Sequence, residues 1–200
     1  MCILETLGTF ILAALALTGS PGPNTLSLAA VGAAFGRLRG LRYMAGLNLG
    51  MAAVILIVGS GVSSLLFAIP GAAPVITVVA GIYFIYLAYR IATAPPLNVT
   101  AKPGSEPKWF EGVFLSLVNP KAYAAMAALF SSFNLVVGDP IVDSVLKAVV
   151  LMSTIIVVNI CWLYAGSALT NFLEHNQISR AINVTFAVLL MVSVVVAVML

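Results

Sequence analysis

Two proline-containing breaks interrupt long apolar segments at matching places in the two halves of the chain. The first is residues 20–24 (SPGPN), inside the apolar run that covers about 3–35. The second is residues 119–121 (NPK), about half a chain length later, inside the run 109–133. Proline lacks a backbone N–H and clashes with the preceding turn, so each break predicts an interrupted helix. Within a membrane, such interruptions are tolerated only where protein or a water-filled cavity satisfies the freed polar groups.

The composition places the chain in the lipid bilayer. Of its 200 residues, 62% are hydrophobic and only 8% are charged, whereas about a quarter of a soluble domain is charged. The net charge of +3 forms no basic patch with interleaved aromatic residues, so we expect no nucleic-acid partner. The two cysteines, Cys2 and Cys161, lie far apart and form no metal-binding motif. With no nucleophile–base pair or phosphate loop in the sequence, we expect neither an enzyme nor a cofactor.

The apolar runs predict an all-α integral membrane protein with six spans. These cover about 3–35, 41–66, 73–91, 109–133, 144–169 and 178–200, with the first and fourth broken at proline motifs. The one clear linker is the polar, proline-rich segment 94–108, which separates two units of three spans, 1–93 and 109–200. Because each unit has an odd number of spans, the second enters the membrane from the opposite side. We therefore predict two inverted repeats, a common plan of transporters.

The basic residues predict which side of the membrane each loop faces. Positively charged residues collect in the cytoplasmic loops of membrane proteins. If the spans alternate in direction, the loops after spans one, three and five share a side, and they hold Arg37, Arg39, Arg42, Arg90, Lys102, Lys108 and Arg180. The opposite loops hold only Lys147, beside Asp139 and Asp143. We therefore expect the 94–108 linker to be cytoplasmic and both termini to be non-cytoplasmic.

Glycines four residues apart mark surfaces of close helix packing. The two rows are Gly32, Gly36 and Gly40, and Gly46 and Gly50. Small residues at this spacing let helix backbones approach closely in lipid. Packing within the chain is the favoured interpretation, and the face of a homodimer is the alternative.

The breaks themselves predict a binding site. Asn119 before Pro120 suits a helix N-cap followed by proline at the first helical position, and Ser20 or Asn24 would play the capping part at the first break. A half-helix beginning inside the membrane has N–H groups without partners and carries the positive end of its dipole. Two such ends aimed at a shared centre suit a carboxylate.

Polar side chains inside the spans add to this site. Lys121 is the one charged residue well inside a span, where a charge costs about 2.5–3.5 kcal/mol on insertion scales. It is expected to contact an anionic substrate group or carry a proton, unless it snorkels to an interface or bonds helix carbonyls. Asn48 and Asn159 lie in spans two and five and either bind substrate or bond to another helix. The predicted substrate-binding residues are Pro21, Gly22, Pro23, Asn24, Asn48, Asn119, Pro120, Lys121 and Asn159.

Several stretches of the chain together resemble the LysE/RhtB family of amino-acid exporters. They are residues 18–24 (TGSPGPN), 36–40 (GRLRG), 46–50 (GLNLG), 81–87 (GIYFIYL) and 112–121 (GVFLSLVNPK). The resemblance implies a small multi-pass protein of the bacterial inner membrane, embedded in lipid. It also implies export of small amino acids or close derivatives, driven by the proton motive force, with protons as the second partner. The alternative function is a non-transporting scaffold or assembly subunit, with the breaks as packed kinks.

Overall fold

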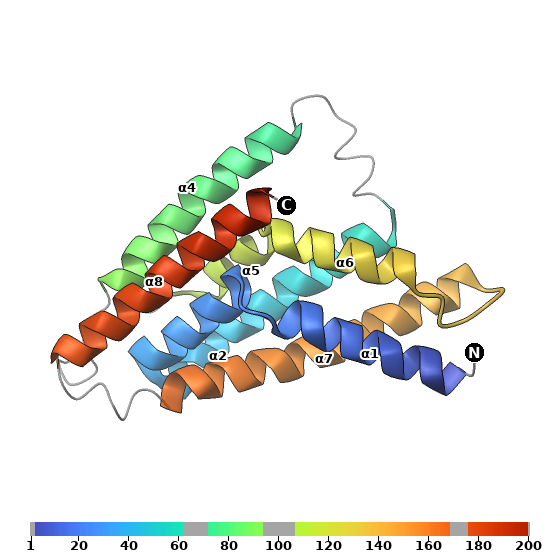
Figure 1. Cartoon of the computed structure of the whole chain (residues 1–200), viewed down its shortest axis with the longest axis horizontal. Coiled ribbons are helices and arrows are strands. Elements are labelled where there is room, and N and C mark those ends of the chain that lie inside the picture. Colours follow the sequence, from blue (N-terminus) through green and yellow to red (C-terminus); the bar gives the residue numbers. More distant parts are fainter. Residues whose placement is uncertain (1–2, 62–71, 94–106, 169–175, 200) are drawn as a thin grey trace.

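The computed structural model describes residues 3–61, 72–93, 107–168 and 176–199, and every regular element in these ranges is an α-helix (Figure 1). The helices are α1 (Ile3–Gly19), α2 (Pro23–Gly59), α4 (Ala72–Ala92), α5 (Trp109–Leu117), α6 (Pro120–Ser132), α7 (Pro140–Ala168) and α8 (Asn176–Met199). The predicted all-α class is therefore confirmed, as are the interruptions at both proline motifs.

Two predicted boundaries were wrong, and one prediction falls outside the described residues. The second span ends at Gly59, capped by Ser60, rather than near residue 66. Helix α7 begins at Pro140, four residues earlier than expected, because the Asp139 side chain accepts hydrogen bonds from the backbone of Ile141 and Val142. Nearly all of the predicted linker 94–108 lies outside the described residues.

A single glycine replaces the loop that was expected between the first two spans. Helical structure continues through residues 36–40, and only Gly36 departs from it, with φ of 76° and ψ of 167°. Backbone with φ in this range is accessible to glycine without steric cost. The chain turns back at this point, so α2 consists of two arms (Figure 1).

Helices α2 and α7 are each long and apolar enough to cross a membrane. Helices α5 and α6 meet at an angle of 60° and pass the same test when they are taken together as one broken span. The part of the chain that the structure describes thus has two candidate spans, or three with the bent pair.

Helix α2 is the centre of the packing. It contacts α7 and α5 most extensively, and α1 packs on α7 and α6 (Figure 1). Helices α4 and α8 lie side by side and cover α2 from another direction. The fold thus surrounds both breaks with helices.

The apolar core is divided into two clusters. One, the Tyr43 cluster, is built around the buried rings of Tyr43 and Phe84. The other, the Phe10 cluster, is built around Phe10 and Met126. The two clusters share no residue.

Four of the five glycines in the two rows lie at contacts within the chain, and the fifth, Gly36, makes the turn in α2. A Cβ atom at Gly50 would lie 2.6 Å from the Val113 carbonyl oxygen, and one at Gly32 would lie 2.5 Å from that of Leu163. Gly40 and Gly46 also face side-chain or backbone atoms of neighbouring helices too closely for a Cβ. These contacts account for the glycine spacing by packing within one chain, and the homodimer stays a prediction.

A buried ion pair fastens the connection between α6 and α7. Asp143 and Lys147 are 6% and 2% exposed, and their Oδ2 and Nζ atoms lie 2.6 Å apart. Asp143 Oδ1 accepts the N–H groups of Leu135 and Val136 at 2.6 and 3.0 Å, and Lys147 donates to the Phe130 carbonyl at 3.0 Å. Both charges lie inside α7, so their placement in a loop by sequence was wrong.

We predict that Gly50→Ala lowers the melting temperature of the protein in detergent, because the new Cβ must push α5 away from α2. Overpacking of this kind costs about 1–3 kcal/mol. The matched control is Gly81→Ala in α4, where a Cβ meets no atom within 4 Å. The control should leave stability unchanged or slightly higher. Equal effects of the two variants would contradict this account of the packing.

We also predict that Asp143→Leu and Lys147→Met each destabilise the protein by about 3–5 kcal/mol, because each leaves an uncompensated buried charge. The double variant should recover part of the loss, since it buries no charge at all. Thermal unfolding of the wild type, both single variants and the double variant gives the coupling between the two residues. Additive losses would show that the two charges do not act as a pair.

Candidate functional site

The two breaks begin new helices in different ways. At the second break Asn119 is the N-cap of α6, its Oδ1 accepts the Lys121 backbone N–H at 3.1 Å, and Pro120 occupies the first helical position, as expected. At the first break the N-cap is Gly22 rather than Ser20 or Asn24. The hydroxyl of Thr25 accepts the Gly22 N–H at 2.9 Å.

The side chains of the two breaks touch each other directly. Asn119 Nδ2 donates to Asn24 Oδ1 at 2.9 Å, and Asn24 Nδ2 donates to Ser116 Oγ at 2.9 Å. Asn119 and Ser116 are both buried, while Asn24 is partly exposed. Segments almost half the chain apart in sequence therefore form one polar centre.

The side chain of Lys121, which belongs to the second break, reaches the backbone of the first break. Its Nζ donates to Ser20 Oγ at 2.7 Å, to the Ser20 carbonyl at 2.9 Å and to the Pro21 carbonyl at 3.0 Å. Among the described residues no carboxylate lies within ion-pair distance of this ammonium. It instead satisfies carbonyl groups just beyond the C-terminus of α1, where a cation also complements the helix dipole.

Gly22 makes room for the lysine. A Cβ atom at this position would lie 2.9 Å from both Cδ and Nζ of Lys121. The side chain of Lys121 thus lies directly on the backbone of the first break. A larger residue at position 22 would displace it.

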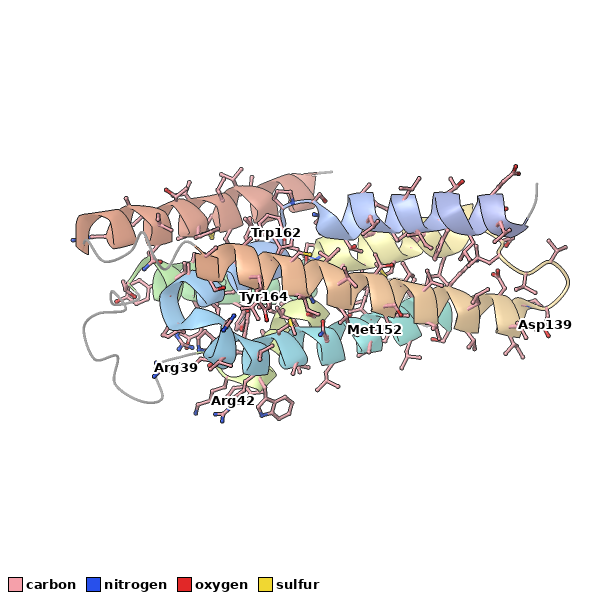
Figure 2. The ribbon with its side chains drawn as sticks, turned by 90° about the horizontal axis from the view of Figure 1, so that it is seen from below. Arg39, Arg42, Asp139, Met152, Trp162 and Tyr164 are labelled. Atoms are coloured by element: carbon pink, nitrogen blue, oxygen red, sulfur yellow. The ribbon has the colours of Figure 1, made fainter. Side chains whose placement is uncertain are left out.

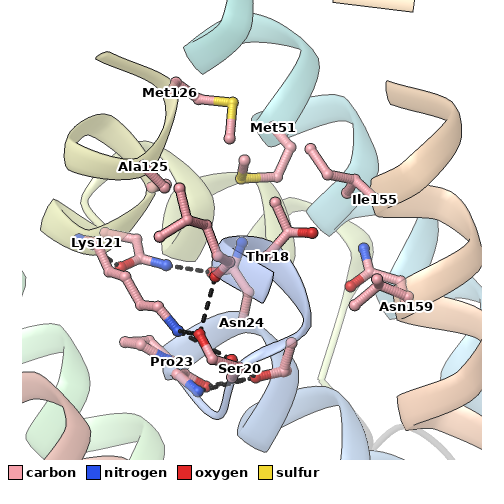
Figure 3. Close-up of a pocket in the computed structure, with 16 residues that line it drawn as sticks. Thr18, Ser20, Pro23, Asn24, Met51, Lys121, Ala125, Met126, Ile155 and Asn159 are labelled. Carbon is pink, nitrogen blue, oxygen red and sulfur yellow. Dashed lines mark hydrogen bonds between the residues drawn. The ribbon is translucent and has the colours of Figure 1, made fainter. Parts of the chain in front are cut away.

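A cavity of about 50 Å³ opens beside this centre. A water molecule needs roughly 10–15 Å³ by the same measure, so the cavity has room for a few waters or a small ligand group. Its lining residues are Leu17, Thr18, Ser20, Gly22, Pro23, Asn24, Thr25, Met51, Asn119, Lys121, Ala122, Ala125, Met126, Ile155, Val158 and Asn159. Figure 3 shows Ser20, Asn24 and Lys121 on one side of it and Met51, Met126 and Ile155 on the other.

The other predicted site residues fall into two groups. Asn159 lines the cavity, and its Nδ2 donates to Asn48 Oδ1 at 2.7 Å, while Asn48 itself is not part of the lining. Pro21 and Pro120 also lie outside the lining, although Pro21 offers its carbonyl to Lys121. Six of the nine predicted residues therefore line the cavity, and Asn48, Pro21 and Pro120 do not.

The cavity lies in a polar layer between the two apolar clusters. In four segments of the sequence, an asparagine lies between a residue of the Tyr43 cluster and a residue of the Phe10 cluster. The triplets are Leu28, Asn24 and Ala14; Leu47, Asn48 and Met51; Leu115, Asn119 and Ala122; and Leu163, Asn159 and Ile155. Along these four segments the polar residue thus separates the two apolar clusters.

Sequence reasoning missed some polar residues of this centre. Ser116 was passed over, although a serine in an apolar run three residues before an N-cap asparagine is a usable signal. Ser20 was considered only as a cap, whereas it accepts hydrogen bonds from Lys121 through its hydroxyl and carbonyl. Trp162 reaches the first break as well, since its Nε1 donates to the Gly19 carbonyl at 3.1 Å.

Comparison with known proteins identifies the family of the chain. The profile of the LysE type translocator family matches residues 14–200, which include both breaks. The chain belongs to the LysE type translocator family. This LysE-type translocator is similar to the cysteine/O-acetylserine efflux proteins of Salmonella typhimurium strain LT2 and Escherichia coli strain K12. It is 28% identical to each, over 172 and 173 residues, or 86% of both chains. No solved structure matches the chain.

Family membership confirms the resemblance noted in the sequence. It makes the chain a membrane transporter rather than an enzyme, in keeping with its several apolar helices.

We predict that Gly22→Ala lowers the melting temperature of this translocator, because its Cβ displaces Lys121 from the Ser20 and Pro21 oxygens. The cost should largely disappear when Lys121 is also replaced by alanine, since the obstructing side chain is then gone. Gly19→Ala is the control, because its Cβ would make only an ordinary contact, 3.9 Å from Val158 Cγ2. An identical cost of Gly22→Ala in both backgrounds would refute the proposed contact.

Proposed function

We propose that the chain is a secondary transporter that exports small neutral amino acids or close derivatives across the bacterial inner membrane. One observation carries this proposal: both broken segments, and a lysine without a carboxylate partner among the described residues, meet at one wall of a cavity whose other wall is apolar. In transporters, broken helices of this kind commonly form the substrate site. The family and the efflux proteins at 28% identity support the same class of function.

The chemistry of the cavity wall supports a zwitterionic substrate. A carboxylate would bind at the amide N–H groups of Asn24 and Asn119, and at Lys121 if the ammonium exchanges one of its three bonds to Ser20 and Pro21 for the substrate. An ammonium group would bind to amide oxygens, of which Asn159 offers one at the wall. The names of the relatives, cysteine and O-acetylserine efflux proteins, agree with a small neutral substrate.

The apolar side of the cavity would hold the substrate side chain. Met51, Met126 and Ile155 form this side, and the lining contains no carboxylate. A cationic side chain would therefore meet Lys121 without a compensating anion. We infer selection for small uncharged side chains and against lysine or arginine as substrates.

The proposed topology has six spans in two inverted repeats, 1–93 and 109–200, with both termini outside the cytoplasm. In support, Pro23 and Pro120 each occupy the first turn of a helix that starts at a break. Arg39 and Arg42 lie toward the end of the molecule opposite Asp139, as the distribution of basic residues requires (Figure 2). Rocking of one unit against the other would open the polar layer alternately to each side.

The transport assay uses purified protein in liposomes and a panel of radiolabelled amino acids. We predict flux of small neutral amino acids such as cysteine, serine and alanine, and none of lysine or glutamate. Lys121→Ala and Asn119→Ala should each reduce flux at least tenfold, because each removes a donor for the carboxylate. Asn183→Ala, a buried amide in α8 outside the cavity, is the matched control and should retain transport.

The same assay distinguishes the alternatives. If Lys121→Ala and Asn119→Ala, both well expressed, leave flux unchanged, the assigned site is wrong. A scaffold would give no flux of any amino acid. Proton coupling predicts that a protonophore abolishes uphill transport, and uphill transport that survives would remove protons from the proposal.

A further inference from the structure

Ser116 in α5 forms the buried end of a hydrogen-bond chain that crosses both breaks. The chain runs from the Lys121 N–H to Asn119 Oδ1 at 3.1 Å, and from Asn119 Nδ2 to Asn24 Oδ1 at 2.9 Å. It continues from Asn24 Nδ2 to Ser116 Oγ at 2.9 Å and ends where Ser116 Oγ donates to the Leu47 carbonyl at 3.0 Å. Four hydrogen bonds thus link α6, both breaks, α5 and α2.

We propose that Ser116 is a positioning residue for transport, which holds the Asn24 amide in the orientation that recognises a substrate carboxylate. The proposal rests on the function proposed above, because it concerns the same cavity. Ser116 does not line that cavity and is completely buried. It therefore acts through Asn24 and not by touching the substrate.

The two ends of the chain fix the direction of every bond in it. A backbone N–H only donates, so Asn119 must present its oxygen to Lys121 and its nitrogen to Asn24. A backbone carbonyl only accepts, so the single hydroxyl proton of Ser116 goes to Leu47, and Ser116 must accept from Asn24. Both ends demand the same orientation, in which Asn24 accepts from Asn119 and donates to Ser116.

This orientation determines what the amides offer to a ligand. The Oδ1 atoms of Asn24 and Asn119 each already accept one hydrogen bond from the series that links Lys121 to Ser116. An amide nitrogen has two protons, so each Nδ2 retains a second N–H after its bond within the chain. The Lys121 ammonium already donates its three protons to Ser20 and Pro21, so these two N–H groups are the donors that remain for a carboxylate.

Without the hydroxyl of Ser116, Asn24 would be held by Asn119 alone. The Asn24 amide could then turn away from the cavity, and its Nδ2 would lose its buried acceptor. The site is too tight for a compensating shift, because a Cβ at Gly50 would already lie 2.7 Å from Ser116 Cβ. The loss of orientation would weaken recognition of the carboxylate more than it would slow the movement of the helices.

The test measures initial rates of uptake of radiolabelled L-cysteine, kept reduced, into liposomes that contain the wild type, Ser116→Ala or Ser27→Ala. Ser27 is the matched control. It is equally buried, donates to the Asn24 backbone carbonyl and accepts from Tyr43, but it makes no hydrogen bond to the side chain of Asn24 or Asn119. We expect Ser116→Ala to raise KM about tenfold, the equivalent of one hydrogen bond, with maximal rate within about twofold. Ser27→Ala should leave KM unchanged.

Two further measurements separate positioning from a general loss of structure. The first is competition by L-cysteinamide, which lacks the carboxylate: Ser116→Ala should lose most of the preference of the wild type for cysteine over this analogue. The second is a double-mutant cycle, in which Asn24→Ala should raise KM much less in the Ser116→Ala background than in the wild type. If Ser116→Ala is too unstable to purify, Ser116→Cys serves instead, because a thiol fills the site but accepts weakly.

The possible outcomes are decisive for both proposals. An unchanged KM and an unchanged preference over cysteinamide in Ser116→Ala would overturn the role of Ser116 and leave the transport function standing. An equal rise of KM in Ser27→Ala would also overturn it, because the effect would then be one of packing. Absence of cysteine flux in the wild type would overturn both the role of Ser116 and the proposed substrate.

Discussion

The backbone groups freed by the two breaks need hydrogen-bond partners, and this requirement organises the molecule. A chain inside a membrane finds no bulk water to satisfy an interrupted helix. At the first break the partners come from elsewhere: Lys121 bonds to the Ser20 and Pro21 carbonyls, and Trp162 bonds to the Gly19 carbonyl. At the second break Asn119 itself caps the new helix. The breaks can exist only because they lie against each other and against α7. A polar centre at this place is thus a consequence of how the helices are broken.

Close helix packing makes this meeting possible. Gly50 and Gly32 let α2 approach α5 and α7 to backbone contact, and the turn at Gly36 brings the two arms of α2 back toward the same centre. Along these helices the Tyr43 and Phe10 clusters lie on either side of the polar residues.

The sequence predicted the breaks, the N-cap at Asn119 and six of the sixteen residues that line the cavity, because proline and capping chemistry act locally. It did not predict the partners of Lys121, since the acceptors are backbone carbonyls, which every sequence contains. It placed the connection between the first two spans correctly but expected a loop over 36–40, because nothing in the sequence indicates that Gly36 alone makes the turn. The Asp143–Lys147 pair was placed in a loop, because two charges near the end of an apolar run give no indication of the groups that will bury them. Local chemistry was therefore readable, and long-range contacts were not.

The most direct test of this account is a distance between the substrate and the lysine. Solid-state NMR of the protein in lipid, with ¹⁵N in lysine Nζ and ¹³C in the carboxyl group of bound cysteine, measures their dipolar coupling. The account predicts a contact of about 4 Å, as in a charge-assisted hydrogen bond, which disappears in Lys121→Met. A bound cysteine whose carboxyl group shows no coupling to Lys121, or a coupling that persists in Lys121→Met, would contradict it.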